Sequence, residues 1–132
     1  MKKSPVVHFE MPYTDAARID AFYTKVFGWQ MKQLGSNMMD YITAQTTETD
    51  ENNMIKDPGA INGGFFPRKE ELQYQIPSVV ISVEDILIAM KNVVDAGGEV
   101  LGEPVVIPGI GQYVSIHDSE GNRVSLLQAL KR

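Results

Sequence analysis

The chain has 132 residues, 43% hydrophobic and 22% charged, which is enough for one globular domain with its own core and too little for two of ordinary size. Its formal net charge is −5, and its 12 lysines and arginines form no dense stripe. Because nucleic-acid binding needs a basic face that neutralises phosphates, this charge argues against that class of partner. The absence of cysteine excludes disulfides, thiolate metal sites and cysteine nucleophiles.

The sequence carries no pattern of export or membrane insertion. Lys2 and Lys3 open it, but Ser4 and Pro5 follow at once and break any apolar signal core. No apolar run approaches the roughly 20 residues that a membrane-spanning helix needs. We therefore expect a cytoplasmic protein.

The first half of the chain predicts a strand, a helix and then further strands. Residues 6–11 read as the first strand, which Pro12 should close. Asp15 can cap a helix that begins at the next residue, and Gly28 can end it. The strands expected after the helix are residues 29–33, 40–45 and 60–66, with an exposed acidic loop over 46–58. Gly63-Gly64 marks a place where a strand can bend or a ligand can approach closely.

The same order of elements then begins again. Residues 79–83 predict a strand rich in β-branched residues, Asp85 or Glu84 can cap the following helix, and Gly97-Gly98 should stop it. The apolar face expected for this helix consists of Ile86, Ala89, Met90, Val93 and Val94. The remaining strands are expected at 99–101, 105–107, 112–116 and 123–128, the last two forming a hairpin across the turn 118–122.

The two halves form an internal repeat. A shift of 70 residues places His8 on Ser78 and Asp15 on Asp85, so the repeat rests on order and spacing more than on identity. Each half can bury only one face of its sheet, so the halves should pack together or swap between subunits. We predict a single domain over residues 1–132, with module 1 at about 1–67, a linker at about 68–74 and module 2 at about 75–132.

The order of these motifs resembles the vicinal oxygen chelate superfamily, which includes glyoxalases, bleomycin-resistance proteins and extradiol dioxygenases. The resemblance rests on His8-Phe9-Glu10-Met11-Pro12, Asp15, Phe22-Tyr23 and Val26-Phe27-Gly28-Trp29 in the first half, and on Val83-Glu84-Asp85, Ala96-Gly97-Gly98 and the turn 118–122 in the second. Ile61-Asn62-Gly63-Gly64 is similar to the glyoxalase-like subgroup. The resemblance implies an α+β fold of two βαβββ modules that form an open, curved mixed β-sheet barrel with flanking helices, and it implies a homodimer.

The resemblance also implies four metal-ligand positions. His8 matches the first of them, whereas Ser78 and Ser125 stand where the family usually supplies His and Glu, and in the remaining segment only Asn62 offers an oxygen. Zinc, nickel and iron prefer imidazole and carboxylate ligands, so this set should hold them poorly. We therefore expect no cofactor and treat His8 as the remnant of a degenerate metal site. A divalent metal completed by Asn62, water or substrate is the alternative.

His8 and Glu10 are the candidate catalytic residues. They are two residues apart on a predicted strand, so their side chains should lie on the same side of the sheet. Such a pair can act as a base with its orienting carboxylate, or it can be an ordinary ion pair. His8 alone can equally be a ligand-binding group or a hydrogen-bonded histidine at a module interface.

Aromatic residues supply further candidates for ligand binding. Trp29 and Tyr113 can line a pocket, as can Tyr41, although packing in the core explains all three. His117 precedes the hairpin turn, and we expect it to be an exposed turn residue.

These observations favour a glyoxalase-like protein that binds a small molecule in the cavity between its modules, through His8, Asn62, Ser78 and Ser125. One alternative is a metal-dependent lyase, isomerase or dioxygenase relative that uses His8. Another is a non-catalytic accessory dimer. A true glyoxalase I is not expected, because Ser125 replaces the carboxylate that would shuttle the proton.

Overall fold

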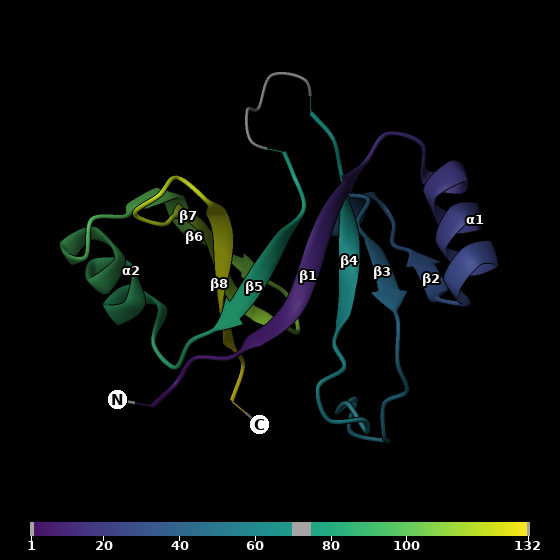
Figure 1. Cartoon of the computed structure of the whole chain (residues 1–132), viewed down its shortest axis with the longest axis horizontal. Coiled ribbons are helices and arrows are strands. Elements are labelled where there is room, and N and C mark those ends of the chain that lie inside the picture. The colour runs from purple at the N-terminus through teal and green to yellow at the C-terminus, as the bar shows by residue number, and fades with distance from the viewer. Residues whose placement is uncertain (1, 70–74, 132) are drawn as a thin grey trace. The chain divides into compact units, whose positions relative to one another are not determined.

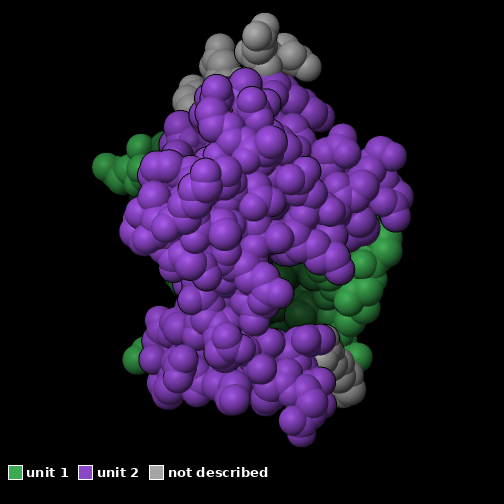
Figure 2. Space-filling view, turned by 90° about the vertical axis from the view of Figure 1, so that its right-hand side faces the viewer, with its two compact units in different colours: residues 1–7, 78–132 green, residues 8–77 purple. Residues whose placement is uncertain are grey.

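The computed structural model describes residues 2–69 and 75–131, and the chain forms two compact units, coloured separately in Figure 2. Unit 1 contains residues 1–7 and 78–132, and unit 2 contains residues 8–77. Each unit holds four β-strands in mixed pairing and one α-helix, labelled in Figure 1. Most of the linker expected at 68–74 lies outside the described residues.

Unit 2 is built on the first β-α-β-β-β segment of the chain. Its elements are β1 (Val6–Tyr13, whose first two residues belong to unit 1), α1 (Ala16–Phe27), β2 (Gln30–Gln33), the short 3-10 helix η1 (Ser36–Met38), β3 (Ile42–Gln45) and β4 (Asn62–Pro67). The strand order is β2-β3-β4-β1. Strands β1 and β4 are parallel, with His8 opposite Asn62 and Glu10 opposite Gly64, and the other two pairs are antiparallel.

Helix α1 covers one face of this sheet. Ile42, Ala44 and Phe65 are buried there, and Ala16, Ile19 and Tyr23 of the helix pack against them. The caps are those that the sequence predicts: the Asp15 carboxylate accepts the Arg18 N–H, and Gly28 ends the helix with a φ of 70°. Pro12 does not close β1 as we predicted, because the fixed φ of proline suits extended backbone and only one N–H is lost.

Unit 1 repeats the plan with the second half of the chain. Its elements are β5 (Ser78–Ser82), α2 (Ile86–Asp95), β6 (Glu99–Ile107), β7 (Gly111–His117) and β8 (Arg123–Ala129). The strand order is β5-β8-β7-β6, with β5 and β8 parallel and the other pairs antiparallel. The core under α2 consists of Ile86, Val114, Ile116 and Leu126.

Two local predictions for unit 1 are wrong. Residues 99–107 form one strand instead of two, because the strand passes Gly102 and Pro104 through an irregularity in the register between Leu101 and Val105. Val94 is 59% exposed and does not belong to the buried face of α2. The cap at Asp85, whose carboxylate accepts two backbone N–H groups, and the closing hairpin are confirmed.

The α+β class and the repeated βαβββ order are confirmed. In each unit the helix leaves one face of the sheet without a helical cover, and we call these the open faces. Among the described residues, neither helix is long and apolar enough to span a membrane.

Candidate functional site

The open face of unit 2 is polar, whereas the face under α1 is apolar. His8 and Glu10 alternate along β1 with Phe9 and Met11, which pack into the core. Glu10 is only 8% exposed, which is unusual for a carboxylate and requires compensating polar contacts. The strand thus puts both candidate catalytic side chains on the open face.

Tyr41 lies between these two side chains. Its hydroxyl is 2.9 Å from Nε2 of His8 and donates a hydrogen bond to Oε2 of Glu10 at 3.1 Å. A phenol has one O–H proton and can donate one hydrogen bond. When it donates that bond to the Glu10 carboxylate, Nε2 of His8 must be the donor to the phenol oxygen. The neutral ring then carries its accepting lone pair on Nδ1. His8 and Glu10 are therefore joined through Tyr41 and do not form the direct ion pair considered from the sequence.

Burial lowers the pKa of His8 below its ordinary value of 6.5, and the negative charge of Glu10 only partly offsets this effect. The ring is consequently neutral near pH 7. A neutral imidazole can accept a proton or a hydrogen bond, which a protonated one cannot.

Gly64 makes room for this arrangement. A Cβ atom at Gly64 would lie 2.1 Å from the Tyr41 hydroxyl, so any larger residue would displace the phenol. A Cβ atom at Gly63 would meet the Phe9 ring at 2.4 Å on the other side of the sheet. The pair Gly63-Gly64, which from sequence marks a close approach, thus accommodates two aromatic side chains. We missed Tyr41 as a central residue, and this glycine pair was the signal that pointed to it.

Asn62 lies beside His8 on the neighbouring strand, but its amide oxygen is already used. It accepts the backbone N–H groups of Thr46 at 2.8 Å and Thr47 at 3.1 Å. This side chain fixes the start of the loop after β3.

The open face of unit 1 carries a chain of hydroxyl groups centred on Ser125. Ser125 is fully buried, and its Oγ lies 2.7 Å from the Tyr113 hydroxyl and 3.3 Å from Oγ of Ser115. Arg123 donates to Ser115 at 3.0 Å. The register places Ser115 directly opposite Ser125, so the β7–β8 hairpin assembles this group.

Ser78 and Trp29 have different surroundings. The Ser78 hydroxyl is buried and makes no hydrogen bond within the described part of the chain. Trp29 packs in the core of unit 2, with its ring stacked on Tyr23 at 4.6 Å between centroids. Trp29 therefore lies with the helix-covered side and not with the polar residues.

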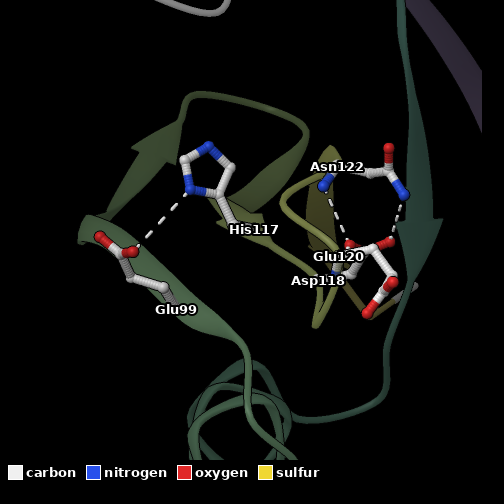
Figure 3. Close-up of polar contacts among 5 residues, drawn as sticks. All are labelled: Glu99, His117, Asp118, Glu120 and Asn122. Atoms are coloured by element: carbon white, nitrogen blue, oxygen red, sulfur yellow. Dashed lines mark hydrogen bonds and ion pairs between the residues drawn. The ribbon is translucent and has the colours of Figure 1, made fainter.

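His117 is not the exposed turn residue that we predicted. It ends β7 with a side chain only 16% exposed, and its Nδ1 lies 3.9 Å from Oε2 of Glu99 on β6 (Figure 3). The next residue, Asp118, organises the hairpin turn by accepting hydrogen bonds from Glu120 and Asn122. These bonds lower the pKa of Asp118, with the side-chain amide of Asn122 as the main cause.

Comparison with known proteins decides the family. The model of the Glyoxalase/Bleomycin resistance protein/Dioxygenase superfamily matches residues 6–126. The chain belongs to this superfamily. No curated protein matches the sequence significantly.

Several solved structures share the fold of this superfamily member. The hypothetical protein BH1468 from Bacillus halodurans is 16% identical, with a TM-score of 0.69 over 99% of this chain and 98% of that one. A methylmalonyl-CoA epimerase variant from Streptomyces coelicolor is 12% identical, with a TM-score of 0.70 over 98% and 100%. A superfamily member from Vibrio splendidus is 13% identical, with a TM-score of 0.58 over 96% and 99%. At these identities the likeness extends to the fold alone.

The donor set of this superfamily member does not fit a transition-metal ion. Within residues 2–69 and 75–131, no three His, Asp or Glu side chains cluster as metal ligands would. Nε2 of His8 is turned to Tyr41, the Asn62 oxygen holds two backbone N–H groups, and Ser125 bonds to Tyr113. Each of these side chains already makes hydrogen bonds within its own unit, so a metal would have to compete with these bonds.

Proposed function

We propose that this superfamily member is a small-molecule-binding protein with a degenerate metal site, and that it binds its ligand by hydrogen bonds on the polar open faces of its sheets. The proposal is carried by the hydrogen-bonded group of His8, Tyr41 and Glu10, whose histidine stands where the resemblance implies the first metal ligand. Buried polar groups are costly, and a protein that had simply lost a function would be expected to replace them with apolar ones.

The two open faces suggest the chemistry of the ligand. Nδ1 of neutral His8 is a hydrogen-bond acceptor, so it suits an O–H or N–H group. On unit 1, the guanidinium of Arg123 and the hydroxyls of Ser115 and Tyr113, which are hydrogen-bonded to Ser125, are groups suited to a carbonyl or carboxylate oxygen. We infer a small polar organic ligand, with an O–H or N–H group where it contacts unit 2 or a carbonyl or carboxylate oxygen where it contacts unit 1.

The test is a binding screen on protein that has been purified without added metal. A library of hydroxy acids and amides is titrated while the backbone amide signals are followed by NMR. We expect saturable shifts around His8 and Tyr41 that become at least tenfold weaker in His8→Gln. Gln30→Ala, an exposed change on β2, is the matched control and should bind as the parent does.

Metal analysis of the same protein distinguishes the main alternative. A stoichiometric transition metal that remains after dialysis and disappears in His8→Gln would replace our proposal with a metal-dependent one. Substoichiometric metal together with the shifts at His8 would support it.

Proton-transfer catalysis by His8 is a second candidate, favoured by the neutral ring that Tyr41 and Glu10 orient. Methylmalonyl-CoA is a suitable probe because epimerases of that compound share the fold. Incubation in D₂O would place deuterium at its acidic C–H if His8 acts as a base. Exchange that His8→Gln abolishes would support an enzyme, whereas saturable binding without exchange would support the binder.

We also propose a homodimer. Val26 and Phe27 on α1 and Leu87 and Val94 on α2 are each more than half exposed, and exposed apolar groups of this size favour association. Light scattering after size exclusion should give twice the chain mass of 14.7 kDa at micromolar concentration. A mass of one chain would contradict this part of the proposal.

A further inference from the structure

Unit 2 has a cleft at the start of α1. None of the residues that line it belongs to the group of His8, Tyr41 and Glu10, which we call the His8 group. The cleft has a volume of about 410 Å³ and lies between the end of β1, the first turns of α1 and the residue after β4. Its polar lining includes Tyr13, Thr14, Arg18 and Arg68, and its apolar lining includes Ile19 and Phe22.

Two arginines from distant parts of the chain, Arg18 and Arg68, line this cleft. The backbone N–H of Arg68 donates to the carbonyl of Tyr13 at 2.8 Å, and its guanidinium donates to the Thr14 hydroxyl at 3.3 Å. Arg18 lies in the first turn of α1. Among the described residues, neither guanidinium has a carboxylate within 4.0 Å.

The acidic residue in the lining, Asp15, already accepts a hydrogen bond. The Asp15 carboxylate caps α1 by accepting the Arg18 N–H at 3.0 Å. With two arginines and one aspartate, the lining is cationic although the whole chain carries a net charge of −5. Guanidinium groups are well suited to the oxygens of a phosphate or carboxylate.

The internal repeat provides a comparison for this cleft. Unit 1 has a cleft of about 440 Å³ at the start of α2, where Asp85, Ile88, Ala89 and Asn92 take the places of Asp15, Arg18, Ile19 and Phe22. There Lys2 is paired with Glu84 at 3.0 Å. The same position in the fold therefore exists without a pair of arginines and without an aromatic wall. The two features in unit 2 are properties of its sequence and not requirements of the fold.

We propose that the cleft of unit 2 is a second binding site, for a small organic anion in which a phosphate or carboxylate is joined to a flat apolar group. The anion would lie between Arg18 and Arg68, and the apolar group against Ile19 and Phe22, whose side chain is 51% exposed. Because the site shares no residue with the His8 group, this proposal can be tested independently of the proposed function.

Phenyl phosphate and benzoate are the probes, and benzyl alcohol is the neutral comparison. Each is titrated into the full chain at low ionic strength, and the amide signals of Thr14 and Arg18 and the guanidinium signals of both arginines are followed by NMR. We expect saturable shifts with at least one anion, a weaker response at high salt, and none with benzyl alcohol. Whichever anion binds more tightly identifies the head group.

Charge-removing variants make the test specific. Arg18→Gln and Arg68→Gln should each weaken binding at least tenfold, and both side chains are exposed, so folding should be retained. Lys25→Gln on the last turn of α1 and Lys3→Gln in the other cleft remove the same charge elsewhere and should leave binding unchanged. Absence of saturable shifts at millimolar anion, or equal weakening by the lysine variants, would overturn the proposal.

Discussion

At the scale of single residues, the position of one proton organises the candidate site. The Tyr41 hydroxyl bonds to both His8 and Glu10, and it has only one proton to donate. The Glu10 carboxylate accepts a hydrogen bond from that O–H, so His8 is held as the tautomer that has its hydrogen on Nε2. Loss of the phenol would leave a buried carboxylate and a buried imidazole without this contact, so the three polar groups depend on one another.

The lowered pKa of His8 predicts a dependence of stability on pH. Above pH 6.5 the ring is neutral in the folded and unfolded chains and contributes nothing, whereas below the folded pKa it is charged in both and burial penalises the folded state. The free energy of unfolding should therefore fall as the pH drops from 6.5 through the folded pKa. The total loss should be about 1.4 kcal/mol for each unit by which folding lowers the pKa of His8. Urea unfolding at several pH values measures this.

The variant His8→Gln should show a smaller loss of stability over that pH range, since it has no ring to protonate. A titration of the His8 ring signals by NMR gives the pKa directly. A value at or above 6.5, or identical pH curves for the two proteins, would contradict the assignment of a buried neutral ring.

Gly64→Ala should disrupt the His8 group by displacing Tyr41. The new Cβ atom would start 2.1 Å from the phenol oxygen, and overpacking of this kind costs about 1–3 kcal/mol. The cost should largely disappear in a Tyr41→Ala background, so urea unfolding of the four proteins in this cycle should give a clear interaction energy.

Gly63→Ala serves as the contrast in this experiment. Its Cβ atom would collide with Phe9 on the core side, so its cost should be the same whether Tyr41 is present or not. If the cost of Gly64→Ala is also the same with and without Tyr41, then Gly64 is not required to make room for the phenol.

At the scale of elements, helix ends could be predicted from the sequence because they depend on neighbouring residues. Asp15, Gly28 and Asp85 act as expected. The errors concern features that depend on strand partners. Pro12 remains in β1 because its partner strand tolerates the missing N–H, and β6 continues past Pro104 because a register irregularity absorbs it. Short-range chemistry does not reveal such partners.

Removal of the two caps should destabilise the protein to different extents. The Asp85 carboxylate accepts the N–H groups of Leu87 and Ile88, whereas that of Asp15 accepts one. Asp85→Ala should therefore cost more than Asp15→Ala, both within about 0.5–2 kcal/mol, and Asp85→Asn should cost little. Urea unfolding ranks the three.

Asp95→Ala is the control for the loss of a carboxylate from α2. Asp95 pairs with Lys91 at 2.7 Å, but both side chains are mostly exposed, so removing it should cost little. A cost for Asp95→Ala equal to that of Asp85→Ala would show that charge, and not capping, governs the stability of α2.

At the scale of the whole molecule, the candidate site was only partly predictable. The alternation of a strand placed His8 and Glu10 on one side, and the strand expected at 123–128 contains Ser125. Tyr41 reaches His8 and Glu10 because β3 pairs with β4 in one particular register, and Arg18 and Arg68 line one cleft because β1 and β4 are parallel neighbours. These placements follow from pairing between distant segments, which one sequence does not specify.

The charge of the whole chain leads to a last prediction, about nucleic acid. A duplex is held by several cations that release counterions together, and the arginine pair at the start of α1 supplies only two in a chain of net charge −5. We expect no saturable change in the fluorescence anisotropy of a labelled DNA duplex at physiological salt, and at most weak binding at low salt. Micromolar binding of the duplex at physiological salt, abolished by Arg18→Gln or Arg68→Gln, would mean that this cleft belongs to a nucleic-acid surface. That result would contradict the proposal that the cleft binds a small organic anion.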